Sequence, residues 1–192
     1  MEKDRLTAFT DGVIAVIITI MVLELKAPHG ADLHALIEQW PSFLSYVLSF
    51  IYVGIYWNNH HHFFQLTPAV NGAILWANLH LLFWLSLVPF ATSWVGENGF
   101  AAGPAAAYGA VLFLCAIAFF VMERVIVAAQ GPDSPLQRAV GVDLKGKLSP
   151  FVYLSGIALA FYRPAISYAL YALVAAIWLV PDRRVEAAVA GR

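Results

Sequence analysis

Charged residues are scarce in this sequence, and cysteine is almost absent. Asp, Glu, Lys and Arg make up 12% of the 192 residues, whereas about a quarter of a typical soluble domain is charged. Hydrophobic residues make up 61% and recur along the whole chain, so we expect an integral membrane protein. The net charge of −1 creates no field that would attract nucleic acid. The single cysteine, Cys115, excludes an intrachain disulfide.

The sequence also lacks the usual marks of an enzyme. It contains no phosphate-binding glycine loop and no plausible pair of nucleophile and base, and we expect neither catalysis nor a cofactor. The potassium-filter sequence "TVGYG" is absent as well. No small-residue cleavage site follows the first apolar run, which ends in "LELKAPHG". We therefore expect this run to be retained as a helix and not removed as a signal peptide.

Six apolar segments are each expected to form a transmembrane helix, which needs about 20 mostly apolar residues. They cover residues 6–25, 41–62, 72–95, 104–127, 148–161 and 164–180. Pro41 suits the first turn of the second helix, and Pro89 predicts a kink in the third. The last two segments are short and separated only by "YRP". They form either an antiparallel pair or one broken helix.

The positive charges favour six spans and one orientation. If the N-terminus lies inside, two of the 11 Lys and Arg residues, Lys26 and Arg163, fall in outer segments. The inner ones are Lys3, Arg5, Arg124, Arg138, Lys145, Lys147, Arg183, Arg184 and Arg192. This positive-inside bias places both termini in the cytoplasm. Of the two longer loops, residues 26–40 are expected to form a small amphipathic segment outside, and 128–147 a cytoplasmic linker.

One face of the first expected helix is apolar apart from a single hydroxyl. At 100° per residue, Ile20 and Leu23 lie within about 40° of Val16, and Thr19 lies about 60° from it. We call these four residues the first-helix stripe. The stripe either packs on lipid or neighbouring helices, with the threonine bonded to the preceding turn, or lines an axis where several copies meet. Periodicity does not choose between these interpretations.

Asp11 lies about 140° around the same helix from Val16. An ionisable group within a membrane segment is a functional hypothesis by default, and an ion ligand is one interpretation. We favour the other, in which the carboxylate accepts hydrogen bonds from another helix and locks the first helix in place. The dipole near the first turns of a helix also favours a negative charge there.

Three consecutive histidines, His60, His61 and His62, lie in "YWNNHHHFF" at the end of the second expected helix. Consecutive helical positions diverge by about 100°, so the three cannot face one metal ion. Isolated His80 is a weak candidate for a haem ligand beside them. We therefore expect no metal site.

These histidines have two other uses. They lie at the same end of the chain's helices as Asp11, and we expect them to form hydrogen bonds with it, with Asn58 and Asn59 as candidate members of the network. The alternative is anchoring at the membrane interface, with Tyr56 and Trp57 forming an aromatic belt.

These stretches resemble the family of the lysosomal potassium channel, transmembrane protein 175, and its bacterial homologues. Arg5 and the "FTDG" of residues 9–12 resemble the family signature Arg-x-x-x-Phe-Ser/Thr-Asp, and "LEL" follows at 23–25. "YWNNHHHFF" and the "FWLSLVPFAT" of residues 83–92 resemble the family's second and third helices. The resemblance covers essentially the whole chain. A single six-helix unit is similar to the bacterial members, which assemble as homotetramers.

The resemblance implies a potassium-selective channel without a pore loop, lined by the first helix. It assigns hydrophobic constriction rings to Val16, Ile20 and Leu23 and a selectivity role to Thr19, the four residues of the first-helix stripe. The family's narrowest ring is often isoleucine, so Val16 is one methylene smaller. The signature and helix-packing residues are Arg5, Phe9, Thr10, Asp11, Gly12, Trp57, Asn59, His60 and His61.

The sequence therefore predicts an all-α channel in a bacterial inner membrane, with copies of itself, lipid and K⁺ as partners. The alternative is a secondary transporter or proton-coupled permease in which Asp11 and His60–His62 relay protons. A membrane enzyme or haem carrier that uses the histidines is a third hypothesis.

Overall fold

The computed structural model describes residues 3–131, 134–140 and 144–180, and these ranges contain helices and no strands. The helices are α1 (Lys3–Leu23), α2 (Leu33–Glu38), α3 (Trp40–Gln65), α4 (Gly72–Leu85), α5 (Val88–Glu97), α6 (Ala102–Gln130), α7 (Pro135–Val140), α8 (Leu144–Ala160) and α9 (Pro164–Leu179). The expected all-α class is confirmed over the described ranges.

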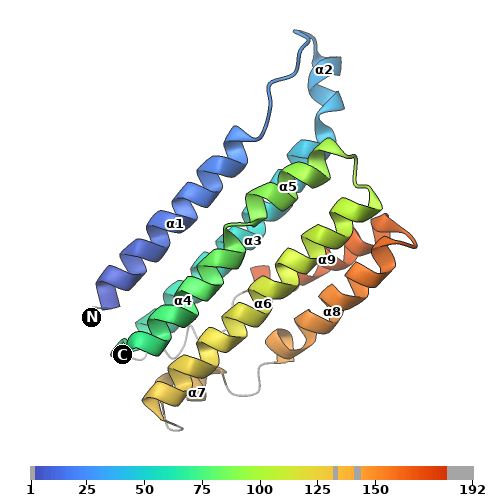
Figure 1. Ribbon diagram of the computed structural model, residues 1–192. Helices are drawn as coiled ribbons and strands as arrows, with labels where there is room; N and C mark the ends of the chain where they lie inside the picture. Colours follow the sequence, from blue (N-terminus) through green and yellow to red (C-terminus); the bar gives the residue numbers. More distant parts are fainter. Residues whose placement is uncertain (1–2, 132–133, 141–143, 181–192) are drawn as a thin grey trace.

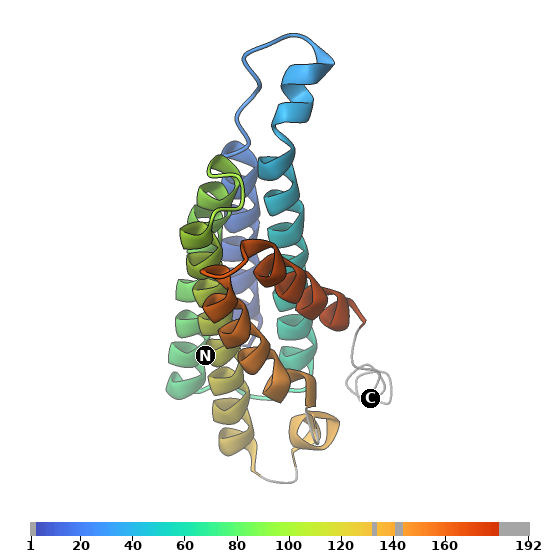
Figure 2. The same cartoon turned by 90° about the vertical axis from the view of Figure 1, so that its right-hand side faces the viewer.

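The long helices run side by side, with α1 at one edge of the bundle (Figure 1). Helix α1 packs against α3, α4 and α5, whereas α6 packs against α4, α5, α8 and α9. Helices α8 and α9 are inclined against the others, and α2 projects beyond the end of the bundle (Figure 2). The bundle thus has an end with the N-terminus, here called the N-terminal end, and an opposite end with α2, here called the α2 end.

The third expected helix is interrupted between α4 and α5. Pro89 lies in the first turn of α5, and proline has no N–H to donate to the carbonyl four residues earlier. The hydrogen bonding tightens just before it, because the Leu87 N–H donates to the Trp84 carbonyl, three residues back, at 3.1 Å. The predicted interruption therefore lies at Ser86 and Leu87, and Val88 separates it from the proline.

Helices α8 and α9 form an antiparallel hairpin, not one broken helix. Ser167 Oγ donates to the Gly156 carbonyl at 2.7 Å near the turn, and Trp178 Nε1 donates to Ser149 Oγ at 2.9 Å at the open end. Tyr171 fits closely against Gly156, where an added Cβ would lie 2.4 Å from a ring carbon of the tyrosine. Glycine is required there because the two helices approach so closely.

Two short helices lie in the loops. The segment expected to be amphipathic contains α2, whose Asp32 cap accepts a hydrogen bond from the Ala35 N–H at 2.9 Å. The expected linker contains α7, and α8 begins at Leu144, four residues before the predicted start at 148. Three arginines counted in the charge analysis, Arg183, Arg184 and Arg192, lie outside the described residues.

Three apolar segments of the described chain are long enough to cross a membrane. They are Lys3–Leu23, Gly72–Glu97 and Ala102–Gln130, and Pro164–Leu179 is a shorter apolar helix. Each of these three spans has more than the roughly 20 residues that a bilayer requires, and so has α3 with its 26 residues. The α8–α9 hairpin has helices of 17 and 16 residues, about 25 Å each at 1.5 Å per residue.

Candidate functional site

Helix α1 has one buried face and one face that the described residues of its own chain leave uncovered. The buried residues recur every three or four positions, as expected for a helix packed on one side. They are Leu6, Thr10, Ile14, Ile17 and Met21. They face α3, α4 and α5, which are the helices that α1 contacts.

The uncovered face contains the first-helix stripe. Val16 is 57% exposed, Ile20 42% and Leu23 75%, and Thr19 is also exposed. The Thr19 hydroxyl donates to the Ala15 carbonyl at 2.8 Å, the local bond that threonine commonly forms in helices. The stripe is therefore a continuous apolar surface with one hydroxyl, and this hydroxyl already donates its proton to a carbonyl of its own helix.

Asp11 is joined to α3 through a tryptophan and not through a histidine. Trp57 Nε1 donates to Asp11 Oδ1 at 2.9 Å, and no described histidine or asparagine bonds to this carboxylate. His61 follows Trp57 by one helical turn, and the two rings stack with centroids 6.1 Å apart. The expected hydrogen bond from the histidines to Asp11 is wrong because the rotation of α3 presents the tryptophan N–H to the carboxylate.

His60 belongs to a second link, which is buried. Its Nε2 lies 2.9 Å from Asn78 Oδ1, and Asn78 Nδ2 donates to Thr10 Oγ1 at 2.9 Å. An amide oxygen only accepts, so the histidine must carry its proton on Nε2. All three side chains are buried. This chain of bonds connects α3 through α4 to α1, and sequence reasoning did not assign the central Asn78 to the site.

The other polar residues at this end bond within their own helices. Asn59 Nδ2 donates to the Ile55 carbonyl at 2.8 Å, and His61 Nε2 lies 2.8 Å from Gln65 Nε2. Trp84 Nε1 donates to His80 Nε2 at 2.9 Å. In the part of the chain that the structure describes, no three His, Cys, Asp or Glu side chains gather as metal ligands.

A model of the family described as the endosomal/lysosomal potassium channel TMEM175 matches residues 5–89, which include α1, α3 and α4. A potassium channel of Chryseobacterium sp. (strain P1-3) is 55% identical over 186 residues, which cover 97% of each chain. The chain belongs to the TMEM175 family. A second relative, a potassium channel of Streptomyces collinus, is 32% identical over 91% of this chain and 90% of its own.

A solved TMEM175 structure has the same fold. The crystal structure of a lysosomal potassium-selective channel TMEM175 homologue from Chamaesiphon minutus has a TM-score of 0.81 and 28% identity. The match covers 94% of this chain and 98% of that chain. The chain is therefore a membrane protein of an ion-channel family and not an enzyme.

The TMEM175 signature residues do not all lie in one place. Thr10 is buried, whereas Phe9 and Gly12 are exposed, and a Cβ added at Gly12 would meet no atom within 4 Å. Arg5 is exposed and forms no hydrogen bond or ion pair with the described residues. It lies about 20° around the helix from Val16, at the N-terminal end of the uncovered face.

Acidic residues lie at the opposite end of this face. Glu24, which follows Leu23 directly, accepts a hydrogen bond from Ser93 Oγ of α5 at 3.0 Å. Lys26 forms an ion pair with Glu97, and this carboxylate raises the pKa of the lysine by hydrogen bonding and by charge. Sequence reasoning gave Glu24 no role. The structure positions it at the α2 end of the first-helix stripe.

Proposed function

We propose that the chain is one subunit of a homotetrameric, potassium-selective channel in a bacterial inner membrane. Each subunit crosses the membrane six times with both termini in the cytoplasm, and ions pass between four copies of α1. The membrane-spanning units are α1, α3, the α4–α5 pair, α6, α8 and α9. The names of the bacterial relatives and the likeness to a potassium-selective channel support this proposal.

The observation that carries the proposal is the uncovered face of α1. The four residues that the family resemblance assigns to the pore are all among the α1 residues that the described part of the subunit leaves exposed. Oligomers with closed symmetry bring the same patch of every subunit to one axis. Around a four-fold axis, the first-helix stripe would form three apolar rings and one ring of hydroxyls.

The hydroxyl of Thr19 is suited to a permeant cation. Its proton is donated to the Ala15 carbonyl, so its oxygen can offer lone pairs to an ion in the pore. A ring of oxygens replaces part of the hydration shell of K⁺. We assign potassium selectivity to this ring.

The apolar rings of Val16, Ile20 and Leu23 provide the gate. Hydrophobic constrictions close a pore by expelling water from a narrow segment. Glu24 lies at the outer mouth in this orientation, where four carboxylates would raise the local concentration of K⁺. Arg5 lies at the cytoplasmic mouth on the same face.

The two links from α1 to its own subunit hold the pore helix in position. Asp11 is held by Trp57, and Thr10 by Asn78. In a transporter, Asp11 and the histidines would need to exchange protons with one another, but here their bonds go to tryptophan and asparagine. These contacts favour a packing role and a channel over a proton-coupled permease.

A flux assay tests the proposal. Purified protein in liposomes with a K⁺ gradient is expected to drive a counter-ion flux that rises linearly with the gradient, and a transporter would instead saturate at a slow turnover. Thr19→Val keeps the shape of the side chain and removes the hydroxyl, and it is expected to lower the K⁺ over Na⁺ preference. Ser155→Ala, which changes an exposed helix hydroxyl of α8 bonded to its own turn, is the control. Absence of flux from intact tetramers at every voltage and pH contradicts the proposal.

A further inference from the structure

The imidazole of His80 is a polar group that the functional proposal above does not use. Trp84 Nε1 donates to His80 Nε2 at 2.9 Å, so Nε2 is an acceptor and the neutral ring carries its proton on Nδ1. No described residue accepts this Nδ1 proton. His80 is exposed on α4, and the exposed Trp76 and Phe83 lie within about 60° of it around the helix. The described residues thus leave one N–H donor unpaired on an otherwise apolar face.

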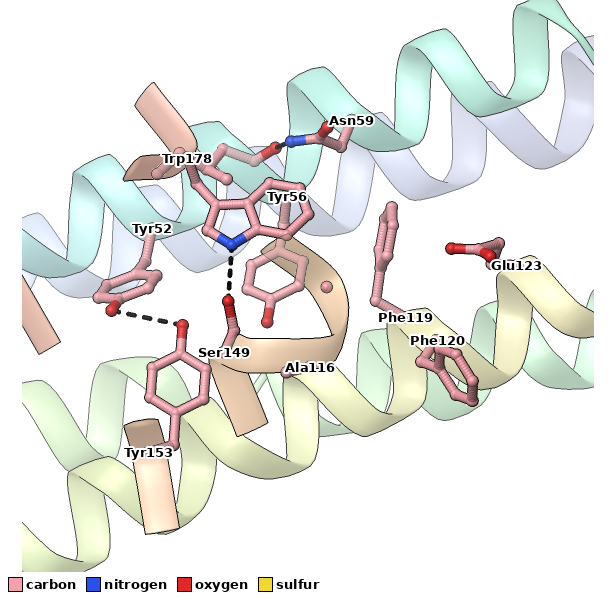
Figure 3. Close-up of a pocket in the computed structure, with 12 residues that line it drawn as sticks. Tyr52, Tyr56, Asn59, Ala116, Phe119, Phe120, Glu123, Ser149, Tyr153 and Trp178 are labelled. Carbon is pink, nitrogen blue, oxygen red and sulfur yellow. Dashed lines mark hydrogen bonds between the residues drawn. The ribbon is translucent and has the colours of Figure 1, made fainter. Parts of the chain in front are cut away.

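Polar side chains between α3, α6, α8 and α9 find their partners within the subunit. Trp178 Nε1 donates to Ser149 Oγ at 2.9 Å in the aromatic cavity that these helices enclose (Figure 3). Tyr153 donates to the Tyr52 hydroxyl at 3.4 Å in the same cavity. These pairs need no second molecule, whereas the Nδ1 proton of His80 has no acceptor among the described residues of its own chain.

His80 lies deep in the membrane-spanning part of the chain. The α4–α5 pair covers 26 residues, about 39 Å at 1.5 Å per residue. If the pair is centred in the bilayer, it extends beyond the hydrocarbon core by about 5 Å at each end. His80 is the ninth residue of the pair, about 12 Å from its start. An N–H group that faces hydrocarbon without an acceptor is costly, so this side chain requires an acceptor from another molecule.

Asp11 presents the complementary group. Its Oδ1 accepts the Trp57 N–H at 2.9 Å, and no described residue bonds to its Oδ2. Asp11 is exposed, and the oxygens of an ionised carboxylate are strong acceptors. The chain therefore carries one unpaired donor, on His80, and one unpaired acceptor, on Asp11.

These two groups lie at the same depth but on different sides of the subunit. The bond of 2.9 Å from Asn78 to Thr10 places these residues side by side. Asp11 follows Thr10 by one residue and His80 follows Asn78 by two, and both helices run toward the α2 end (Figure 1). At 1.5 Å per residue, the two levels differ by about 1.5 Å. His80 points away from α1, however, because it lies about 200° around α4 from Asn78.

We propose that His80 donates its Nδ1 proton to Asp11 Oδ2 of a second copy, the next subunit around the axis. This inference rests on the tetramer proposed above. A closed ring joins two different faces of neighbouring subunits. Rotation about an axis along the membrane normal keeps the depth of every residue, so groups that lie level within one subunit also lie level between subunits. The carboxylate of Asp11 then joins Trp57 of its own chain to His80 of the next.

Cysteine cross-linking tests this contact. His80→Cys and Asp11→Cys are combined in one chain, and the native Cys115 stays in place because it is buried. A short bis-methanethiosulfonate reagent, applied to the protein in membranes, is expected to link the subunits into a ladder up to the tetramer on a denaturing gel. Each single variant is expected to remain monomeric on the same gel.

Two further substitutions make the test independent of whether the double cysteine variant folds. His80→Phe removes the donor and is expected to raise about tenfold the protein concentration at which the tetramer dissociates in detergent. Asp11→Asn keeps one acceptor oxygen, which can serve Trp57 or His80 but not both. In that background, His80→Phe is expected to have little further effect. The control His34→Phe changes an exposed histidine of α2 and should leave the concentration unchanged.

The outcomes separate this inference from the channel proposal. A native tetramer without a cross-link between positions 11 and 80 would overturn the inference and leave the channel proposal standing. Equal dissociation of His80→Phe and the wild type would do the same. A native protein that stays monomeric at every concentration, measured by light scattering, would overturn both. None of these readouts depends on ion flux.

Discussion

Replacing Asn78 by leucine is expected to loosen α1 from the rest of its subunit. The amide is 2% exposed and bridges His60 and Thr10 with two hydrogen bonds of 2.9 Å. Asn78→Leu removes both bonds and leaves the Nε2 proton of His60 buried without an acceptor. The Thr10 hydroxyl loses a donor, but it can still bond to the preceding turn of its own helix. The cost therefore falls mainly on the histidine.

The magnitude is bounded from two sides. Hydrogen bonds between membrane helices average about 0.6 kcal/mol and reach about 1.7 kcal/mol, whereas an orphaned buried donor costs about 1–3 kcal/mol. We expect the substitution to lower the free energy of unfolding by about 1–3 kcal/mol. Each kcal/mol shifts the melting temperature of a chain of this size by about 2–4 °C, so the midpoint should fall by about 2–12 °C.

Thermal unfolding of the detergent-solubilised protein, followed by fluorescence at one fixed scan rate, measures this shift. A fixed rate is needed because unfolding of such proteins is often irreversible. The double variant His60→Phe/Asn78→Leu is the informative control. It replaces both partners by apolar groups and keeps the ring that stacks on Phe64 at 4.5 Å, so it should recover part of the loss. An unchanged midpoint for Asn78→Leu, or a double variant less stable than the single one, would refute the reasoning.

Three further substitutions test other contacts. Gly156→Ala would place a Cβ 2.4 Å from the Tyr171 ring and should destabilise the hairpin by about 1–3 kcal/mol in the same thermal assay. The control Gly54→Ala should leave the midpoint unchanged, because its added Cβ meets no atom within 4 Å. Glu24→Gln should reduce K⁺ conductance in dilute salt and have little effect at 1 M, where charges are screened beyond about 3 Å; an equal loss at both concentrations contradicts an electrostatic role. Lys26→Met removes only an exposed ion pair and should leave the midpoint unchanged.

The sequence was sufficient for features that depend on one helix at a time. Helical periodicity placed Val16 and Leu23 on one face, and that face is exposed. The position of Pro89 predicted the interruption of the third helix to within three residues, because proline disturbs the hydrogen bonds of the turn before it.

Features that depend on the rotation of one helix against another could not be predicted. The histidines were expected to bond to Asp11, but the structure turns Trp57 toward it, and a few tens of degrees of rotation about α3 decide between them. Asn78 could have been noticed as an amide in the apolar run "ILWANLHLLF", since a buried polar side chain needs a partner. Its partner, however, lies 68 residues away in sequence, and no local pattern identifies it.

The uncovered face of α1 also has a consequence for the assembly proposed above. Before assembly this face must contact lipid, and an unsatisfied polar group there would be costly. The only hydroxyl of the first-helix stripe is already bonded to the Ala15 carbonyl, so the isolated stripe presents no unbonded donor to hydrocarbon. For the proposed homotetramer, this means that the stripe of a single subunit can face lipid without an unbonded donor before the copies meet in the plane of the membrane.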